Sequence, residues 1–366
     1  MDTIRRYRAT FWHGMSTAAW WQLLRTHDFR IEASRLTVGA SVTCATAVNS
    51  LLSLLQSAVY GARLRATRIE HDPVFILGHW RSGTTHLHNL LALDDRFAFP
   101  TSFECFAPHH CLLTDRIYPK LVSRLLPRTR TIDDVAFGYE MPQEDEFALV
   151  ALGAPSPIWS LAYPYDTTGQ AYLTLRDIPE PEREKWQGLL LQFLRLVTFR
   201  HQGKPLILKS PPHTARLALL ARMFPRARFL HIVREPCVVF ASTVQTWRTL
   251  RGVNALVKRS PPAVEAYVLR TLNQMYEGFE TARNALQPGR FHQLRYEDLV
   301  RDPLTTLEQS YQAIGLGDFE RVRSHIANYL AGLRNYRTNG HAISPEGRAA
   351  VREAWGAIYR QWGYEI

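Results

Sequence analysis

The chain has 366 residues, of which 46% are hydrophobic, so it has enough apolar material for a packed core and is not a disordered chain. Its net charge is +11, but the basic residues are spread along the sequence, which argues against a nucleic-acid-binding stripe and favours an anionic small ligand or a membrane surface. The four cysteines have no paired spacing, so we expect reduced thiols and a cytoplasmic protein.

Residues 1–70 differ in character from the rest and are predicted to form a helical N-terminal appendage. The segment 36–60 contains no charged residue and is long enough to cross a bilayer. It is also rich in Ser, Thr, Asn and Gln, which favours a packed helix or a helix on a membrane surface over a transmembrane helix. Arg63, Arg65 and Arg68 follow it and suit an anionic lipid surface, although they equally fit an ordinary solvated face.

The stretch from residue 73 to residue 91 carries the strongest local signal. Residues 74–77 form a short apolar run that ends in glycine, which predicts a buried strand. A small polar loop, 78–85, follows, and a helix is predicted from Thr84 onward. This order of strand, tight loop and helix aims backbone N–H groups and the positive end of a helix at a phosphate.

The loop almost fits the phosphate-binding pattern of the nucleotide triphosphatases. Gly78 and Gly83 have the required spacing and Thr85 occupies the Ser/Thr position, but Thr84 stands where that pattern has lysine. The nearest cation is Arg81, inside the loop. The loop therefore keeps a phosphate cradle but lacks the lysine with which an ATP or GTP site contacts the terminal phosphates.

The segments after this helix are candidates for an acceptor pocket. Residues 97–110 are rich in aromatic side chains around a single acid, Glu104, and such a stretch suits a pocket wall. The histidines in and near this segment lack the spacing of a zinc site, so no metal site is predicted. The acidic run 139–146 contains Glu144 and is either a solvated helix start or a source of a carboxylate that faces the acceptor. Residues 151–180 are predicted to be a long covering loop.

Two later strands end in cations. The strand 206–209 ends in Lys209, and a charge at the end of a buried strand is costly unless it meets an anion. The strand 228–233 is followed by Arg234, where a kinase-like site would often have an acid for Mg²⁺. This pattern predicts an anion site that needs no metal. Further on we predict a long helix over 262–286, a strand over 291–294 and three more helices, at 303–314, 318–331 and 345–360.

Together these motifs resemble the sulfotransferases that use 3′-phosphoadenylyl sulfate (PAPS). The run Arg81 to Thr85 is similar to the 5′-phosphosulfate loop of that family, and Lys209 occupies the place of the lysine at the transferring sulfonate. Arg234 and Ser242 have the spacing of the arginine and serine that bind the 3′-phosphate. The resemblance covers roughly residues 70–250 and is closest to a bacterial branch with Arg-Ser-Gly-Thr-Thr loops.

The resemblance implies an α/β fold with a P-loop NTPase-like, mostly parallel sheet flanked by helices, in a domain spanning 71–366. It implies transfer of a sulfonate group from PAPS to a hydroxyl group or an amine, without a metal, leaving 3′,5′-ADP. Tyr296 lies in a Tyr-Glu-Asp-Leu run like that near the family's nucleotide, and Arg337 is a candidate for a late basic loop over the 3′-phosphate. The nucleotide-binding residues predicted in this way are Arg81, Ser82, Gly83, Thr84, Thr85, His86, Arg234, Ser242, Tyr296 and Arg337.

The general base has three candidates. His213 is preferred because histidine acts at neutral pH without a large pKa shift, although it would also serve as a helix cap. Glu104 is second, since burial would have to raise its pKa, and Glu144 is third. Lys209 is the fourth residue expected to take part in catalysis.

The identity of the acceptor is less determined. A phenol, a lipid, a sterol-like alcohol, an acidic glycan or a peptide would suit these segments, and the uncharged stretch 36–60 favours an acceptor at a membrane surface. Nucleic acid is not expected as a partner. Two other functions remain open on the sequence alone: a Mg²⁺-dependent P-loop kinase and a catalytically silent nucleotide-binding module.

Overall fold

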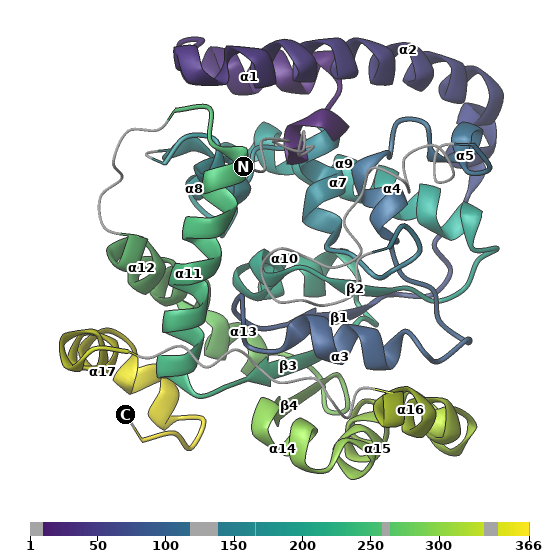
Figure 1. Cartoon of the computed structure of the whole chain (residues 1–366). Coiled ribbons are helices and arrows are strands. Elements are labelled where there is room, and N and C mark those ends of the chain that lie inside the picture. The colour runs from purple at the N-terminus through teal and green to yellow at the C-terminus, as the bar shows by residue number, and fades with distance from the viewer. Residues whose placement is uncertain (1–9, 118–137, 165, 258–263, 333–342, 366) are drawn as a thin grey trace.

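A computed structural model describes residues 10–117, 138–164, 166–257, 264–332 and 343–365 of the chain. The candidate residue Arg337 lies outside these residues. Figure 1 shows helices α1 and α2 along the upper edge of the molecule, α14, α15 and α16 along the lower edge, and a sheet between them.

The sheet has four strands, all parallel, in the order β2-β1-β3-β4. The strands are β1 (Val74–Leu77), β2 (Ile207–Lys209), β3 (Arg228–Val233) and β4 (Phe291–Arg295). Because the carboxyl ends of parallel strands meet at one edge of the sheet, the loops after β1, β2 and β3 converge there. The predicted α/β fold with a parallel sheet is confirmed.

Helices cover both faces of the sheet, and successive strand residues face different cores. Phe75 and Leu77 of β1 belong to a large core that the helices α9 to α12 also fill. Val74 and Ile76 belong to a smaller core with α3, α15 and α16. Every residue of β1 is buried, which is the pattern of a central parallel strand and explains its continuous apolar run.

The helices agree with the sequence-based prediction in most places and differ in two. The helix predicted over 262–286 is two helices in the described residues, because Gly278 has φ +72° and interrupts it between α12 and α13. The predicted loop 151–180 contains a 3₁₀ helix, Pro157–Leu161, and α8. The helices are α1 (Thr17–Thr26), α2 (Leu36–Ala66), α3 (Thr84–Leu91), α4 (Ser102–Phe106), α5 (Cys111–Thr114), α7 (Asp145–Leu152), α8 (Thr168–Ala171), α9 (Glu180–Arg200), α10 (Leu217–Met223), α11 (Pro236–Asn254), α12 (Val264–Tyr276), α13 (Phe279–Asn284), α14 (Tyr296–Arg301), α15 (Pro303–Ile314), α16 (Glu320–Gly332) and α17 (Pro345–Arg360).

The N-terminal helices pack directly on the body of the protein. The indole N–H of Trp12 donates to the carbonyl of Asn254 at 2.7 Å, and Trp12 and Trp20 belong to the large core. The Asn49 amide of α2 donates to the carbonyls of His13 and Met15 at 2.8 and 2.9 Å. The predicted boundary at residue 70 stays a prediction, and across it the two parts share one core.

Replacing Asn49 with alanine should loosen this layer, since it leaves two carbonyl groups without their donor. We expect a loss of about 1–3 kcal/mol, the typical cost of unpaired buried polar groups, seen as a lower urea midpoint by circular dichroism. Ser57→Ala changes an exposed side chain of the same helix and serves as the control. Equal midpoints for the two variants would contradict the role assigned to Asn49.

Candidate active site

The loop after β1 has the backbone conformation of a tight phosphate cradle. Gly78, Arg81 and Gly83 have φ values of +147°, +68° and +104°, and α3 begins at the next residue. A Cβ atom at Gly83 would lie 2.3 Å from Cδ2 of Tyr296, so only glycine fits there. The loop is also anchored to the turn after β2, because the Gly78 N–H donates to the Thr214 hydroxyl at 2.8 Å.

Four of the predicted nucleotide-binding residues lie against one another at the edge of this loop. The Arg81 guanidinium donates to the Ser242 hydroxyl at 2.9 Å, and Arg234 donates to the carbonyl of Arg81 at 3.2 Å. The Arg234 guanidinium also stacks over the ring of Tyr296 at 4.1 Å. These side chains come from the β1 loop, the end of β3, α11 and the start of α14, and they form a concentration of positive charge beside the N-terminus of α3. Such a site favours a phosphate group.

Lys209 joins the loop to the acidic run of the sequence. Its ammonium group lies 2.7 Å from Oε1 of Glu144 and 3.3 Å from the Thr85 hydroxyl, and the residue is 2% exposed. Glu144 immediately precedes α7, whose first turn contains Asp145 and Glu146. The acidic run is therefore a helix start, but a buried one and not the solvated one that the sequence suggested, because Asp145 and Glu146 are 0% exposed. That a carboxylate of this run faces the acceptor stays a prediction.

The contact between Lys209 and Glu144 is the outer member of three neighbouring ion pairs. Three consecutive acids at the start of α7 meet three basic side chains that follow one another on β2 and the 3₁₀ helix Pro211–Arg216. The pairs, here called the ionic ladder, are Glu144 with Lys209 at 2.7 Å, Asp145 with His213 at 2.7 Å and Glu146 with Arg216 at 2.6 Å. The second and third pairs are fully buried. Burial alone would raise the pKa of Asp145, but the charge and hydrogen bond of His213 outweigh it and leave that pKa lowered.

Comparison with known proteins shows the family. A profile of the sulfotransferase family matches residues 73–321. The chain is 39% identical over 362 residues to the omega-hydroxy-beta-dihydromenaquinone-9 sulfotransferase Stf3 of Mycobacterium bovis and of Mycobacterium tuberculosis, covering 99% of this chain and 93% of those proteins. The chain belongs to the sulfotransferase family. It is an enzyme of that class, and this excludes the kinase and the silent binding module.

Other similar proteins support the fold of this sulfotransferase. The crystal structures of sulfotransferase STF9 from Mycobacterium avium and STF1 from Mycobacterium tuberculosis superpose with TM-scores of 0.71 and 0.65 at 17% and 18% identity. They cover 96% and 94% of this chain, and 98% and 94% of their own chains. Carbohydrate sulfotransferase 5 of Mus musculus is 31% identical over 138 residues, which is 35% of each chain.

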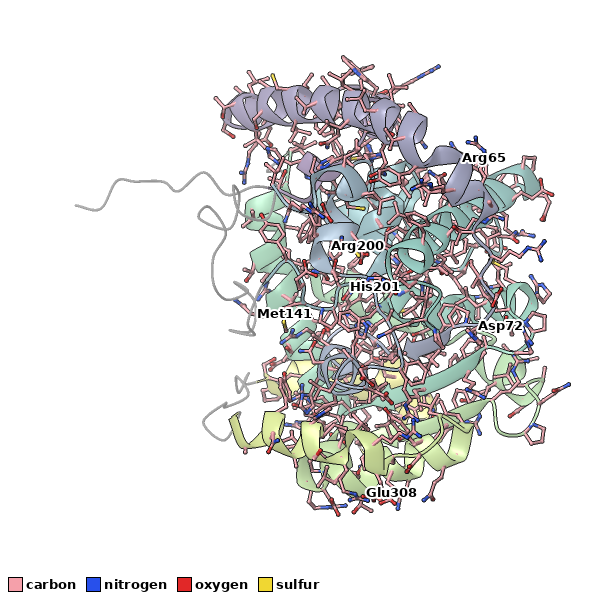
Figure 2. The ribbon with its side chains drawn as sticks, turned by 90° about the vertical axis from the view of Figure 1, so that its right-hand side faces the viewer. Arg65, Asp72, Met141, Arg200, His201 and Glu308 are labelled. Atoms are coloured by element: carbon pink, nitrogen blue, oxygen red, sulfur yellow. The ribbon has the colours of Figure 1, made fainter. Side chains whose placement is uncertain are left out.

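The three candidates for the general base differ in their burial and contacts. The His213 side chain is 0% exposed, its Nε2 is held by Asp145, and its Nδ1 has no hydrogen-bond partner among the described residues. Glu104 is equally buried; its Oε2 accepts from the Thr101 N–H in a capping box of α4 and its Oε1 meets His201 at 3.0 Å. Figure 2 labels His201 within the body of the protein. The Glu144 side chain is 13% exposed and adjoins Lys209, so the geometry favours Glu144.

The remaining predicted residues lie close by. Ser82 and Thr84 are buried at the turn into α3, and the Ser82 hydroxyl donates to the carbonyl of His79 at 2.8 Å. Burial lowers the pKa of His86, whose ring lies 6.4 Å from that of Tyr296. Among the described residues, no group of three or more His, Cys, Asp or Glu side chains is placed to hold a metal ion.

The sequence analysis did not identify three residues that shape this site. Asp145 and Arg216 carry the buried members of the ionic ladder. His88 of α3 is buried; burial, together with the charge of Lys209, lowers its pKa to about 3. His88 therefore presents a neutral side chain near Lys209. The spacing of Lys209, His213 and Arg216 opposite three consecutive acids was a usable signal for the ladder, whereas nothing in the sequence pointed to His88.

The innermost pair of the ladder gives a stability prediction. Arg216→Met leaves the Glu146 carboxylate buried without its cation, so we expect a loss of about 3–5 kcal/mol, the usual cost of breaking a buried ion pair. Chemical denaturation followed by fluorescence measures it. Arg301→Met removes the cation of an exposed pair with Asp298 and should have little effect. A similarly small effect at Arg216 would show that the ladder does not hold α7 in place.

Proposed function

We propose that this sulfotransferase transfers the sulfonate group of PAPS to the hydroxyl group of a lipid acceptor, with Glu144 as general base and Lys209 as the cation at the leaving oxygen. The observation that carries the proposal is the contact of Lys209 with both the Glu144 carboxylate and the Thr85 hydroxyl. It sets a proton acceptor and a cation side by side at the mouth of the phosphate loop.

The residues at the loop fit a nucleotide that carries phosphate at both its 3′ and 5′ positions. The backbone of residues 78–85 and the N-terminus of α3 suit the 5′-phosphosulfate, since they supply N–H donors and a positive helix end. Arg81, Arg234 and Ser242 suit the 3′-phosphate, which ATP and GTP lack. When bound, PAPS supplies an activated sulfonate, and its transfer leaves 3′,5′-ADP.

Each of the two residues at the centre has a defined task. Lys209 donates to the oxygen that leaves sulfur, where negative charge develops as the bond breaks, and such a preorganised donor stabilises the transition state. Glu144 accepts the proton of the acceptor hydroxyl as its oxygen bonds to sulfur. In the free enzyme Lys209 also holds the Glu144 carboxylate in position.

The acceptor class is supported by the relatives. The name of Stf3 states that it acts on an omega-hydroxylated dihydromenaquinone, a lipid, and the likeness to this chain extends over nearly the whole of both proteins. The likeness to a carbohydrate sulfotransferase covers only 35% of the chain, so a glycan has weaker support. We therefore place the hydroxyl acceptor among apolar lipids and the enzyme at the cytoplasmic surface of a membrane.

Calorimetry with 3′,5′-ADP and 5′-AMP, in EDTA and without Mg²⁺, tests the donor site. We expect the wild type to prefer 3′,5′-ADP. Arg234→Ala should weaken 3′,5′-ADP binding by roughly 10- to 100-fold, because a hydrogen bond to a charged group contributes about 1.5–3 kcal/mol. Binding of 5′-AMP, which has no 3′-phosphate, should change little. Equal affinity of the wild type for both nucleotides would rule out PAPS as donor.

The base assignment is tested by Glu144→Gln, with radiolabelled PAPS and an omega-hydroxylated menaquinone as acceptor. We expect kcat to fall by about 10²- to 10⁴-fold, the usual contribution of a general base, while 3′,5′-ADP affinity stays within a few-fold. Glu140→Gln alters an exposed acid nearby and is the matched control. Full turnover in Glu144→Gln, together with loss of turnover in a folded His213→Gln variant, would move the role to His213.

A further inference from the structure

Helix α2 has its polar side turned toward the protein. Its buried residues are mostly small or polar: Gly39, Val42, Thr46, Asn49, Gln56 and Gly61. Besides the two hydrogen bonds of Asn49, the Gln56 amide donates to the carbonyl of Pro108 at 3.0 Å and accepts from the Leu112 N–H at 2.9 Å. An ordinary surface helix buries its apolar side against the body, so the arrangement in α2 is the reverse of the usual one.

The opposite side of α2 is apolar and faces away from the body. Six large apolar side chains there are more than half exposed; they are called the outer stripe and comprise Leu36, Val48, Leu51, Leu54, Leu55 and Val59. In both views α2 forms the upper boundary of the molecule, with no described element outside it (Figures 1 and 2). An exposed apolar stripe of this kind marks an interaction surface.

Positive charge lies at the C-terminal end of the outer stripe. Arg63, Arg65 and Arg68 are all exposed at this end, and the Arg65 guanidinium lies beside Gly61 at the rim of the helix. Figure 2 labels Arg65 at the edge of this upper layer. Beneath it lies a cavity of about 380 Å³, lined by Arg65, Arg195, Ser53, Ser57 and Gln192 among others. Cations and hydroxyl groups beside an apolar stripe match the phosphate level of an anionic bilayer.

Aromatic side chains of the same layer add to this match. Trp21 of α1 and Phe29, shortly after it, are about half exposed, and their ring centroids are 5.7 Å apart. Tryptophan is enriched at the boundary between lipid and water, where its ring is partly apolar and its N–H stays near polar groups.

The contacts of α2 indicate that it lies along a membrane and does not cross it. The segment Ala33–Ala66 is long and apolar enough to span a bilayer, and its most apolar stretch of 18 residues has a mean hydropathy of 1.6. However, its inner side is bound along its length, from Thr43, which accepts from the indole N–H of Trp20 at 3.0 Å, to Tyr60, whose ring packs against Phe199. If α2 crossed the bilayer, these contacts would be lost and the amides of Asn49 and Gln56 would be exposed to hydrocarbon.

We propose that the outer stripe docks the enzyme on the surface of an anionic lipid membrane, with α2 lying in the plane of that surface and its basic end on the lipid phosphates. Helix α7 then sets the depth of the active site. It begins beside Glu144 and ends at the N-terminal layer, where the Ser16 N–H donates to the carbonyl of Ala151 at 3.1 Å. Its eight residues span about 12 Å. This last step rests on the proposed lipid acceptor, whose hydroxyl has to rise past the layer of α2 as well, by roughly 20 Å in all.

Vesicle flotation of the full chain tests the docking directly. We expect binding to vesicles of phosphatidylcholine with phosphatidylglycerol, weaker binding to phosphatidylcholine alone, and loss of binding in high salt. Leu51→Asp combined with Leu55→Asp should reduce binding at least tenfold. Val59→Ser and Val300→Ser are a matched pair, since the two valines are 59% and 53% exposed; only Val59→Ser should weaken binding. Affinity for 3′,5′-ADP, measured in parallel, checks folding.

Cys44 offers a built-in reporter, because it is exposed on α2 while the other three cysteines are buried. An environment-sensitive fluorophore attached there should shift to the blue on anionic vesicles and not on neutral ones. Three outcomes would each overturn the proposal. They are an absence of vesicle binding, sedimentation that shows a dimer formed through the outer stripe, and binding that resists alkaline carbonate, which reports insertion into the bilayer. None of these outcomes depends on PAPS, so a failure of the donor assignment would be seen separately in the calorimetry.

Discussion

The arrangement of this site depends on the charges that the fold buries between α7 and the end of β2. Each buried ion would be strongly unfavourable alone, because it gives up its hydration, and it is tolerated only beside a partner of opposite charge. Two members of the ionic ladder, Asp145 with His213 and Glu146 with Arg216, are wholly enclosed. They hold the start of α7 against the 3₁₀ helix that follows β2. Glu144 is the residue just before α7, so this packing places it beside Lys209.

The same constraint gives Lys209 two partners of different kinds. In the free protein its charge is balanced by Glu144, and its second neighbour, the Thr85 hydroxyl, belongs to the phosphate loop. An anion that binds at the loop becomes a second negative group beside Lys209, which already contacts Glu144. The arginines at the loop edge, Arg81 and Arg234, provide further positive charge, so the site as a whole favours a ligand with several negative charges.

The sequence predicted those features that are set by local structure. The strand, glycine-bounded loop and helix around Gly78 to Thr85 were recognisable because each part is specified by neighbouring residues, and the cationic strand ends at Lys209 and Arg234 followed from strand patterning. The burial of the base candidates could not be predicted, because burial is a tertiary property: His201, just after α9, and the capping box of α4 enclose Glu104, and the ladder encloses His213. The sequence showed that 36–60 carries no charge, but it did not show which side of that helix faces the protein. That side is set by Asn49 and Gln56, which donate to carbonyl groups from distant parts of the chain.

Helix α7 connects these two parts of the molecule. Its first turn carries the acids of the ladder, and its last turn supports the N-terminal layer through the contact of Ala151 with Ser16. A helix of this length is stiff, so any force on the layer is transmitted to the position of Glu144 without much bending. If α2 is held on a membrane, the position of Glu144 relative to the membrane surface is set by this single element. An enzyme that must place a hydroxyl group against sulfur gains from this, because alignment of the reacting groups supplies a large part of the rate.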